Sequence, residues 1–367
     1  MTKTAAILIS RQGRHPCRTT PWIVQLEKAI HWLQNNPHHV YTSLGQQTWE
    51  LQIFFAQKKN IDQTIVIPEN DKAQFEKIRQ IAITQFSLDT SRVQFEKIYP
   101  EGSKSLLYQR DAQIISNSDL LIPISLRKKG HMETLIHSAP AKKRLINDFQ
   151  INYCPEKARI AYKIDKNLLT KEVLGLKSQY IIHWTRGSNG PWPTEKKIDY
   201  YQAITNSDSY PRNAFAGIEN MFTRGYIKAS SRHMPQKTPT VSFSILPPHE
   251  AVSLMYWRAR YCQMSFEPYG IGIDKDYAIS MGIQPVQYFQ PKNKPKNIVP
   301  WRCQSAGKRS DWQQEHEYRY LGDLDLALVP NEKLICFCYR QNEARDIQKR
   351  FGVQCIAMLS SNGHGVF

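Results

Sequence analysis

Residues 5–10 read AAILIS, residues 11–18 read RQGRHPCR, and Thr20-Pro21 follows them; this stretch decides the fold of the first part of the chain. The apolar run predicts a short buried strand. The polar, glycine-containing segment predicts a loop. Thr20-Pro21 predicts the start of a helix, because a hydroxyl side chain is a good N-cap and proline is tolerated at the first helical position. Apolar residues then keep helical spacing as far as Leu33.

The same alternation continues outward from this stretch. Further strands are predicted at 39–43, 64–67, 93–98 and 119–124, and further helices at 48–59, from about 71, and at 106–117. Alternating strands and helices imply right-handed crossovers and a parallel sheet, with ligands at the carboxyl ends of the strands. We therefore predict an α/β domain over residues 1–150.

The pattern changes after residue 147. Apolar segments become shorter, richer in aromatic residues and interrupted by Pro and Gly, which is typical of an α+β domain with long loops. We predict this domain over residues 160–367, with the boundary between 148 and 166. Its expected strands lie at 180–184, 240–245, 270–273, 285–289, 315–321 and 333–339, and an aromatic-rich helix is expected at 254–261.

The chain of 367 residues has a net charge of +17, and both predicted domains are basic. Such a charge attracts polyanions, so nucleic acid or a phosphate-rich ligand is an expected partner. No apolar run approaches the ~20 residues of a membrane-spanning helix. The seven cysteines are scattered without a CxxC pair, which favours a reducing compartment, and we expect a cytosolic protein. Cys336 and Cys338 are expected to be buried thiols without the spacing of a zinc site.

Two segments of the first domain predict a nucleotide site. Backbone N–H groups of 10–14 follow the first strand, where they can meet a phosphate at a helix N-terminus. Residues 108–111, YQRD, precede SDLLIPISLRKKGHME at 118–133. This order resembles the SLOG superfamily of Rossmann-like proteins. The resemblance implies that Arg110 and Glu133 bind the ribose and phosphate of a nucleotide. The family's PGGxGTxxE is replaced here by SLRKKGHME, so binding is expected rather than hydrolysis.

Three separated motifs mark the second domain: YIIHWTRG at 180–187, TVSFS at 240–244 and DWQQEHEYRY at 311–320. Strand alternation puts Ser242 and Ser244 on one face, and it puts Glu315 and Glu317 together on another. A histidine strand, a serine strand and a Glu-x-Glu strand in this order resemble an uncharacterised bacterial family related to the ADP-ribosyltransferase fold.

The resemblance implies a reaction in which NAD loses nicotinamide through a positively charged, oxocarbenium-like ribose. Glu317 would stabilise that charge, Glu315 would orient or deprotonate the nucleophile, and His183 would bind the adenosine-side ribose. No metal is expected. The remaining NAD contacts that the resemblance implies are the diphosphate partner Arg186, Ser242 supporting Glu317, and Phe243 or Tyr269 stacking on nicotinamide.

Two basic stretches with interleaved aromatic residues are candidate nucleic-acid contacts, because phosphate pairing and base stacking together grip single strands. Their members are Arg224, Lys228, Arg232, Lys292, Lys294, Lys296, Trp301 and Arg302.

The leading hypothesis is an ADP-ribosyltransferase-like enzyme that uses NAD and acts on nucleic acid, joined to a nucleotide-binding domain, as would suit a defence effector. One alternative is an enzyme that modifies a base in DNA or RNA without NAD. Another is a non-catalytic nucleotide sensor that binds nucleic acid. Simpler interpretations stand beside these: Arg110 and Glu133 as surface charges, His183 as a core residue, and Glu317 as the ion-pair partner of Arg319.

Overall fold

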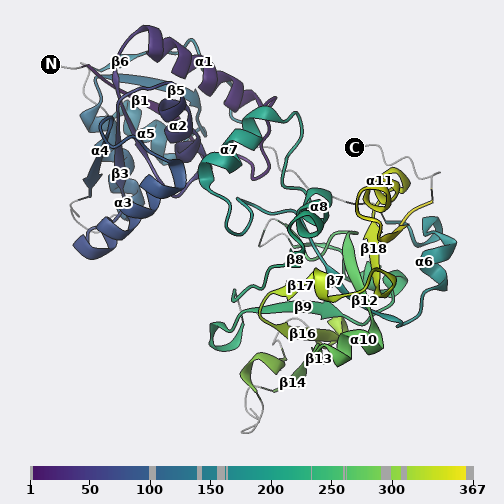
Figure 1. Ribbon diagram of the computed structural model, residues 1–367. Coiled ribbons are helices and arrows are strands. Elements are labelled where there is room, and N and C mark those ends of the chain that lie inside the picture. The colour runs from purple at the N-terminus through teal and green to yellow at the C-terminus, as the bar shows by residue number, and fades with distance from the viewer. Residues whose placement is uncertain are drawn as a thin grey trace. The chain divides into compact units, whose positions relative to one another are not determined.

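The protein divides into two compact units in a computed structural model that describes residues 3–98, 105–138, 143–154, 162, 164–232, 234–258, 261, 263–290, 299–306 and 312–360. The first unit comprises 1–158 and 189–211, and the second comprises 159–188 and 212–367 (Figure 1). The predicted domains, 1–150 and 160–367, placed residues 189–211 in the second domain, whereas in the structure they belong to the first unit.

The first unit contains a six-stranded sheet in the order β4-β3-β2-β1-β5-β6, and every neighbouring pair is parallel. The parallel α/β fold predicted from the alternation of strands and helices is confirmed. The strands are β1 (Thr4–Ile9), β2 (His39–Ser43), β3 (Gln63–Ile67), β4 (Val93–Lys97), β5 (Leu120–Ser125) and β6 (Arg144–Leu145).

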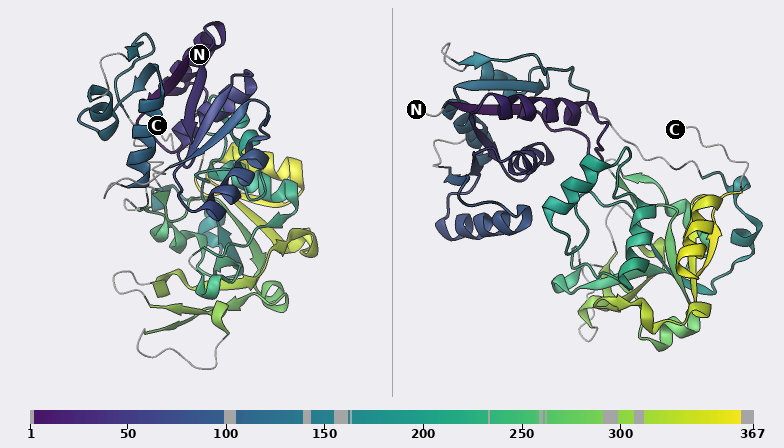
Figure 2. Two further views of the ribbon diagram at one scale, coloured as in Figure 1. Left: turned by 90° about the vertical axis from the view of Figure 1, so that its left-hand side faces the viewer. Right: turned by 45° about the horizontal axis from the view of Figure 1, so that its top comes forward.

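Helices cover both faces of this sheet (Figure 2). Alternate residues of β1 enter different cores: Ile7 packs with α1 and α2, and Leu8 packs with α4 and α5. The chain first builds outward from β1 to β4 and then crosses to β5 on the other side of β1. The strand order therefore reverses between β1 and β5, which is where parallel α/β sheets bind ligands. The helices are α1 (Pro21–Asn35), α2 (Gln47–Lys58), α3 (Lys72–Phe86), α4 (Leu106–Asn117) and α5 (His131–His137).

Helix α7 (Lys197–Asn206) explains why 189–211 belongs to the first unit. Its residues Tyr200, Tyr201 and Ile204 are buried in the same core as α1 and α2. The Tyr201 hydroxyl donates to Glu50 Oε2 at 2.8 Å, and Lys197 Nζ lies 2.6 Å from Glu50 Oε1. Glu50 is itself buried on α2, so these two partners offset the cost of removing its charge from water.

The second unit contains a seven-stranded mixed sheet in the order β13-β16-β9-β7-β12-β18-β19. Its pairs are antiparallel except for β18 and β19, which α11 joins. The strands are β7 (Tyr180–Trp184), β9 (Thr240–Ser244), β12 (Gly270–Asp274), β13 (Gln284–Pro285), β16 (Glu317–Leu321), β18 (Leu334–Cys338) and β19 (Gln354–Ala357).

Short elements complete the second unit. Its helices are α6 (Lys171–Gly175), α8 (Ala214–Arg224), α9 (Pro248–Ala251), α10 (Lys275–Ser280) and α11 (Gln341–Phe351). Its two-stranded pairs are β8 (Tyr226–Ile227) with β17 (Leu324–Asp325), β10 (Trp257–Arg258) with β11 (Gln263–Met264), and β14 (Gln287–Phe289) with β15 (Cys303–Ser305). None of the helices in the described part of the chain has the length and apolar character needed to cross a lipid bilayer.

The helix predicted at 254–261 is wrong. A 3-10 turn ends at Leu254, and Trp257 pairs with Met264 across the hairpin of β10 and β11. Aromatic and bulky residues suit a pleated surface as well as a helix face, and here pairing with a neighbouring strand decided between them.

Candidate functional site

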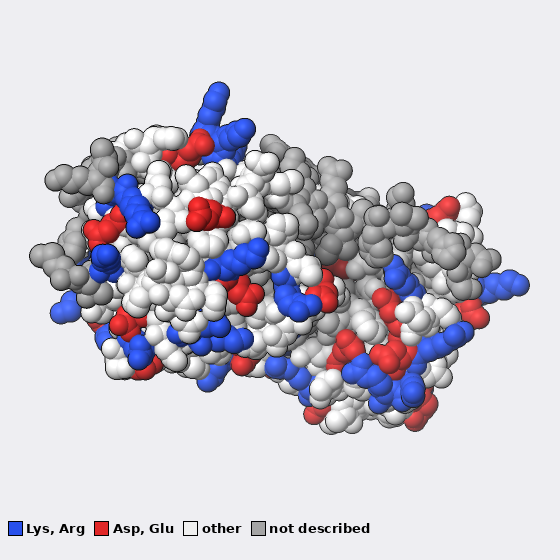
Figure 3. All heavy atoms as spheres, turned by 90° about the horizontal axis from the view of Figure 1, so that it is seen from above, with Lys and Arg blue, Asp and Glu red and all other residues white. Residues whose placement is uncertain are grey.

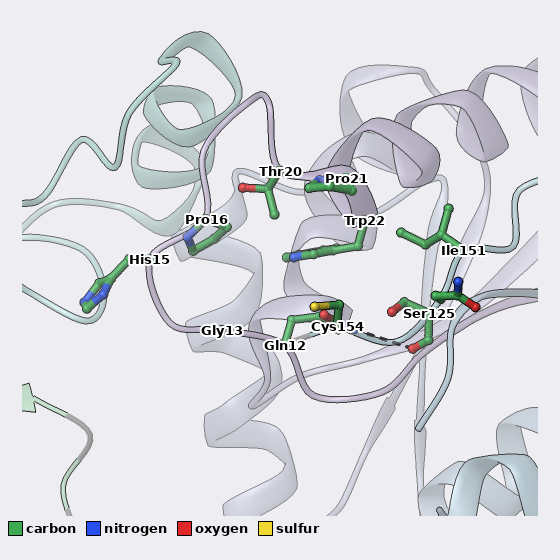
Figure 4. A pocket seen from close by; sticks show the side chains of 11 residues that line it. Gln12, Gly13, His15, Pro16, Thr20, Pro21, Trp22, Ser125, Ile151 and Cys154 are labelled. Carbon is green, nitrogen blue, oxygen red and sulfur yellow. Dashed lines mark hydrogen bonds between the residues drawn. The ribbon is translucent and has the colours of Figure 1, made fainter. Parts of the chain in front are cut away.

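A cavity of about 320 Å³ opens in the first unit at the carboxyl ends of β1 and β5 (Figure 4). Its volume lies at the lower end of the range for small-molecule sites. It sits where the strand order reverses, which is the expected position for a ligand of this fold. The lining residues are Gln12, Gly13, His15, Pro16, Thr20, Pro21, Trp22, Ser125, Ile151, Asn152 and Cys154.

The floor of the cavity is formed by two loops that are bonded to each other. The Ser10 N–H donates to the Ser125 carbonyl at 2.9 Å, and the Arg127 N–H donates to Ser10 Oγ at 2.9 Å. Gln12 Nε2 donates to the Ser10 carbonyl at 3.1 Å. These bonds hold the segment after β1 against the segment after β5, so the floor is built before any ligand arrives. The segment 10–14, predicted to meet a phosphate, contributes Gln12 and Gly13 to the lining.

The first turn of α1 borders the cavity. Thr20 occupies the N-cap position, but its side chain makes no capping bond to the helix; instead Thr20 Oγ1 accepts the Cys17 N–H at 2.9 Å. The first turn carries no acidic residue, and none of the described residues that line the cavity is acidic. The partial positive charge of the helix terminus therefore faces the cavity without a resident carboxylate to neutralise it.

Trp22 and His15 differ in how they meet this cavity. The Trp22 ring lies across it between Pro21 and Cys154, whereas the His15 ring points away from it (Figure 4). His15 Nε2 lies 2.8 Å from Asn189 Oδ1, and the His15 ring packs on Tyr210 at 4.6 Å between centroids. Burial lowers the pKa of His15 and outweighs the hydrogen bond to Asn189. His15 therefore supports the loop as a neutral imidazole.

Arg110 and Glu133, for which the SLOG resemblance implies contacts to a nucleotide, do not line this cavity. Arg110 is 1% exposed and donates through Nε and Nη2 to Asp111 Oδ1, at 2.8 and 2.7 Å. Glu133 Oε2 accepts the Lys129 N–H at 2.6 Å in the turn before α5. Arg110 is thus a core ion-pair partner, and Glu133 stabilises a turn.

A second polar site lies on the sheet of the second unit, around Glu317 at the start of β16. Ser242 Oγ donates to Glu317 Oε1 at 2.7 Å, so the structure places Ser242 where it supports the glutamate. Arg319 donates to both oxygens of Glu317, through Nε at 2.8 Å and Nη2 at 2.9 Å. Glu317 therefore accepts three hydrogen bonds from two residues, Ser242 and Arg319.

His183 lies on the other face of this sheet, which corrects the expected pairing of His183 with Glu317. Strand β7 pairs with β9 through Ile182 and Ser244, so His183 lies opposite Phe243. The two rings are 5.8 Å apart, and His183 Nδ1 donates to the Ser242 carbonyl at 2.8 Å. Burial lowers the pKa of His183 and favours the neutral imidazole, although the residue stays partly exposed.

Phe243 and Tyr269, the two expected nicotinamide-stacking residues, are both buried at 3% exposure. The Tyr269 hydroxyl donates to the carboxylate of Glu343 at 3.0 Å. Each ring is therefore part of the packed core, which leaves no open face on which nicotinamide could stack.

Glu315 lies near Glu317, but it is not part of the same strand, in contrast to what the sequence predicted. It ends the 3-10 turn Trp312–Glu315, and His316 has a positive φ of 45°, so the two glutamates do not alternate along one strand. Burial, and then the negative charge of Glu317, raise the pKa of Glu315 to about 7. Its carboxyl group is therefore poised to gain and lose a proton near neutral pH.

Arg258 lies within electrostatic reach of both Glu315 and Arg186. The positive charges of Arg258 and Arg319 lower the pKa of Glu315 and so partly offset the rise that burial and Glu317 cause. Loss of water around the guanidinium, and then the charges of Arg258 and Arg232, lower the pKa of Arg186. A cluster of like charges favours an anionic ligand, because an anion relieves the repulsion between them. Sequence analysis did not select Arg258 as a site residue, because it predicted a helix at 254–261, where the structure has strand β10.

The predicted basic stretches are only partly described. Lys292, Lys294 and Lys296 lie outside the described residues. Lys228 forms an ion pair with Asp323 at 2.6 Å, and the carbonyl of Trp301 accepts from Arg319. The other three expected contacts are exposed Arg224 and Arg232 and half-buried Arg302.

Basic and acidic side chains are interspersed on the face seen in Figure 3. Among the described residues of that face, no continuous basic stripe stands out. The described basic side chains of this face are therefore dispersed rather than gathered in one track.

Comparisons with known proteins add little to this geometry. No family model matches the chain, and no curated protein matches it. Among solved structures, the DNA processing protein A of Streptococcus pneumoniae is similar in part, with 14% sequence identity and a TM-score of 0.28. The match covers 39% of this chain and 49% of that protein, about half its length. A likeness this weak carries no argument about function.

Proposed function

We propose that the first unit binds a nucleotide in the cavity between the ends of β1 and β5. The observation that carries the proposal is the position of this cavity, at the reversal of strand order and beside the first turn of α1. The phosphate lies against the N-terminus of α1, where the helix dipole favours negative charge. The apolar wall of Pro16, Pro21 and Trp22 receives the base or sugar.

The test is a titration of the full-length protein with AMP, ATP, NAD and ADP-ribose, followed by calorimetry and by melting temperature. The key variant is Thr20→Asp. Aspartate is a good N-cap and retains an oxygen for the Cys17 N–H, so the helix is preserved while a negative charge enters the cavity. We expect its affinity for the phosphate ligand to fall about tenfold, on the order of 1.4 kcal/mol.

The matched control is Ser105→Asp, which makes the same kind of change at the N-cap of α4, outside this cavity. It should bind as the unmodified protein does. Absence of binding by every nucleotide, or equal affinity in Thr20→Asp and the unmodified protein, would overturn the proposal.

A second candidate function is ADP-ribosyl transfer from NAD at the glutamates of the second unit. It is favoured by Glu315, whose pKa of about 7 beside Glu317 and Arg258 suits proton transfer next to an anion. The bond from ribose to nicotinamide breaks, nicotinamide leaves with its electron pair, and a bond forms from ribose to a nucleophile of nucleic acid. The Glu315 carboxylate takes the proton of that nucleophile. Neither His183, Phe243 nor Tyr269 takes part.

Incubation of the protein with NAD and with DNA or RNA, followed by mass spectrometry, tests this candidate. Nicotinamide release and a mass gain on the nucleic acid, both lost in Glu315→Gln, are the expected results. A modified base that forms without NAD would instead indicate a base-modifying enzyme. Nucleotide binding with no product at all would indicate a non-catalytic sensor.

A further inference from the structure

Three cysteines from two strands meet in the second unit. Cys336 and Cys338 are two residues apart on β18, so their side chains share a face of the sheet. Cys355 on β19 is the direct partner of Cys336 in the parallel register. The Sγ atoms of Cys336 and Cys338 are 4.0 Å apart, and those of Cys338 and Cys355 are 3.6 Å apart. All three sulfur atoms lie within 4.8 Å of one another.

This triangle has the dimensions of a metal site. Sulfur ligands lie about 2.3 Å from zinc. Three sulfurs at that distance in one plane around a shared ion are about 4.0 Å apart, which is the bond length multiplied by the square root of three. Two of the separations, 3.6 and 4.0 Å, lie close to this value, and the third is no more than 4.8 Å. An ion at the centre would therefore need little movement of the strands.

The surroundings favour a soft ion with access from one side. Cys336 and Cys338 are fully buried, whereas Cys355 is partly exposed. Among the described residues, no histidine or carboxylate joins the three sulfurs within the same distance. A ligand set made of thiolates alone selects thiophilic ions such as zinc or cuprous copper over magnesium or calcium.

We propose that Cys336, Cys338 and Cys355 bind a thiophilic metal ion of the d10 class, Zn²⁺ or Cu⁺. Binding replaces the three thiol protons with one ion, and the protons are released to solvent. With Zn²⁺ the site carries one net negative charge and keeps a position open for a fourth ligand. The sequence did not predict this site, because its third sulfur comes from a neighbouring strand and the local spacing of Cys336 and Cys338 is not that of a zinc motif.

The site is tested on the full-length protein kept reduced. Elemental analysis of the purified protein comes first. Titration with Cd²⁺, and with Cu⁺ under anaerobic conditions, then follows the thiolate-to-metal absorption. We expect one ion per chain and an absorption intensity equivalent to three metal–sulfur bonds. X-ray absorption of the zinc-loaded protein should show three sulfur neighbours at about 2.3 Å, a measurement that needs no variant.

Cys355→Ser is the informative variant, since Cys355 lies at the partly exposed corner of the triangle. It should weaken metal binding by at least about tenfold and reduce the absorption to that of two bonds. Cys303→Ser removes a buried cysteine outside the cluster, and it should leave both unchanged. Three results would overturn the proposal: no ion bound by the folded, reduced protein, unchanged binding in Cys355→Ser, or isolation of a Cys338–Cys355 disulfide in place of a metal site.

Discussion

Glu317 and Arg319 form a bidentate ion pair along one face of β16, and the guanidinium of Arg319 is almost completely satisfied. Beyond its two bonds to Glu317, Arg319 donates to the carbonyls of Trp301 and Cys303 and to the side chain of Gln304. Arg319 is 1% exposed. Glu317 is therefore the counter-charge of a buried cation, and this structural role holds whatever chemistry takes place beside it.

Replacement of Glu317 by Gln should be costly for stability. The amide keeps one acceptor for Arg319 but leaves the buried guanidinium without a negative partner, so we expect a loss of about 2–4 kcal/mol in the free energy of unfolding. Urea unfolding measures this loss. Glu332→Gln, at an exposed glutamate, is the control and should change stability by less than about 0.5 kcal/mol. Equal stability of both variants would contradict the structural role of Glu317.

The stability of the protein should depend on pH through Glu315. Its pKa is raised from 4.5 to about 7 in the folded state, so between these values the folded chain binds more protons than the unfolded chain. The free energy of unfolding should therefore fall as pH rises from about 4.5 to 7, on the order of 2 kcal/mol after allowance for partial exposure. Melting temperatures from pH 5 to pH 8 should show a smaller decline in Glu315→Gln than in Glu332→Gln, and identical profiles would exclude this effect.

Arg110 should behave as a core residue. Arg110→Met leaves the buried carboxylate of Asp111 with His131 as its remaining ionic partner, and we expect a loss of about 3–5 kcal/mol. Adding Asp111→Leu should recover most of that loss, since a pair of apolar residues leaves no buried charge. A stable Arg110→Met protein with impaired nucleotide binding would instead restore the ligand-binding role that the family resemblance implies.

Gly272 on β12 is required by close packing. A Cβ atom at this position would lie 2.7 Å from Ile335 Cγ2 on the neighbouring β18. We expect Gly272→Ala to destabilise the second unit by about 1–3 kcal/mol, because the core must move to accept the methyl group. Gly175→Ala is the comparison, since nothing lies within 4 Å of a Cβ there. Thermal unfolding should separate the two variants, and equal melting temperatures would argue against the close approach.

The elements of the first unit were predictable because their signals are local. The apolar runs at 5–10 and 64–67 and the Thr20-Pro21 helix start specify strand and helix without reference to distant residues. The second unit was less predictable. The segment 254–261 carries aromatic residues that suit either element, and pairing with β11 decided the outcome.

The candidate site was predictable only in part. The loop after β1 was expected to meet a phosphate, and Gln12 and Gly13 do line the cavity. Ser125 and Ile151 come to the same cavity through the parallel sheet, where they form a bridge with each other. No local pattern marks these two residues as neighbours of Gln12.

By itself, the sequence determined the alternation of strands and helices in the first unit, the basic charge and the positions of the carboxylates, imidazoles and thiols along the chain. Only the tertiary structure decided which of these groups meet. Alternation states which residues share a face of one strand, but the register between strands sets which faces coincide. That register separates His183 from Glu317, places Ser242 beside Glu317, and brings Cys355 beside Cys336.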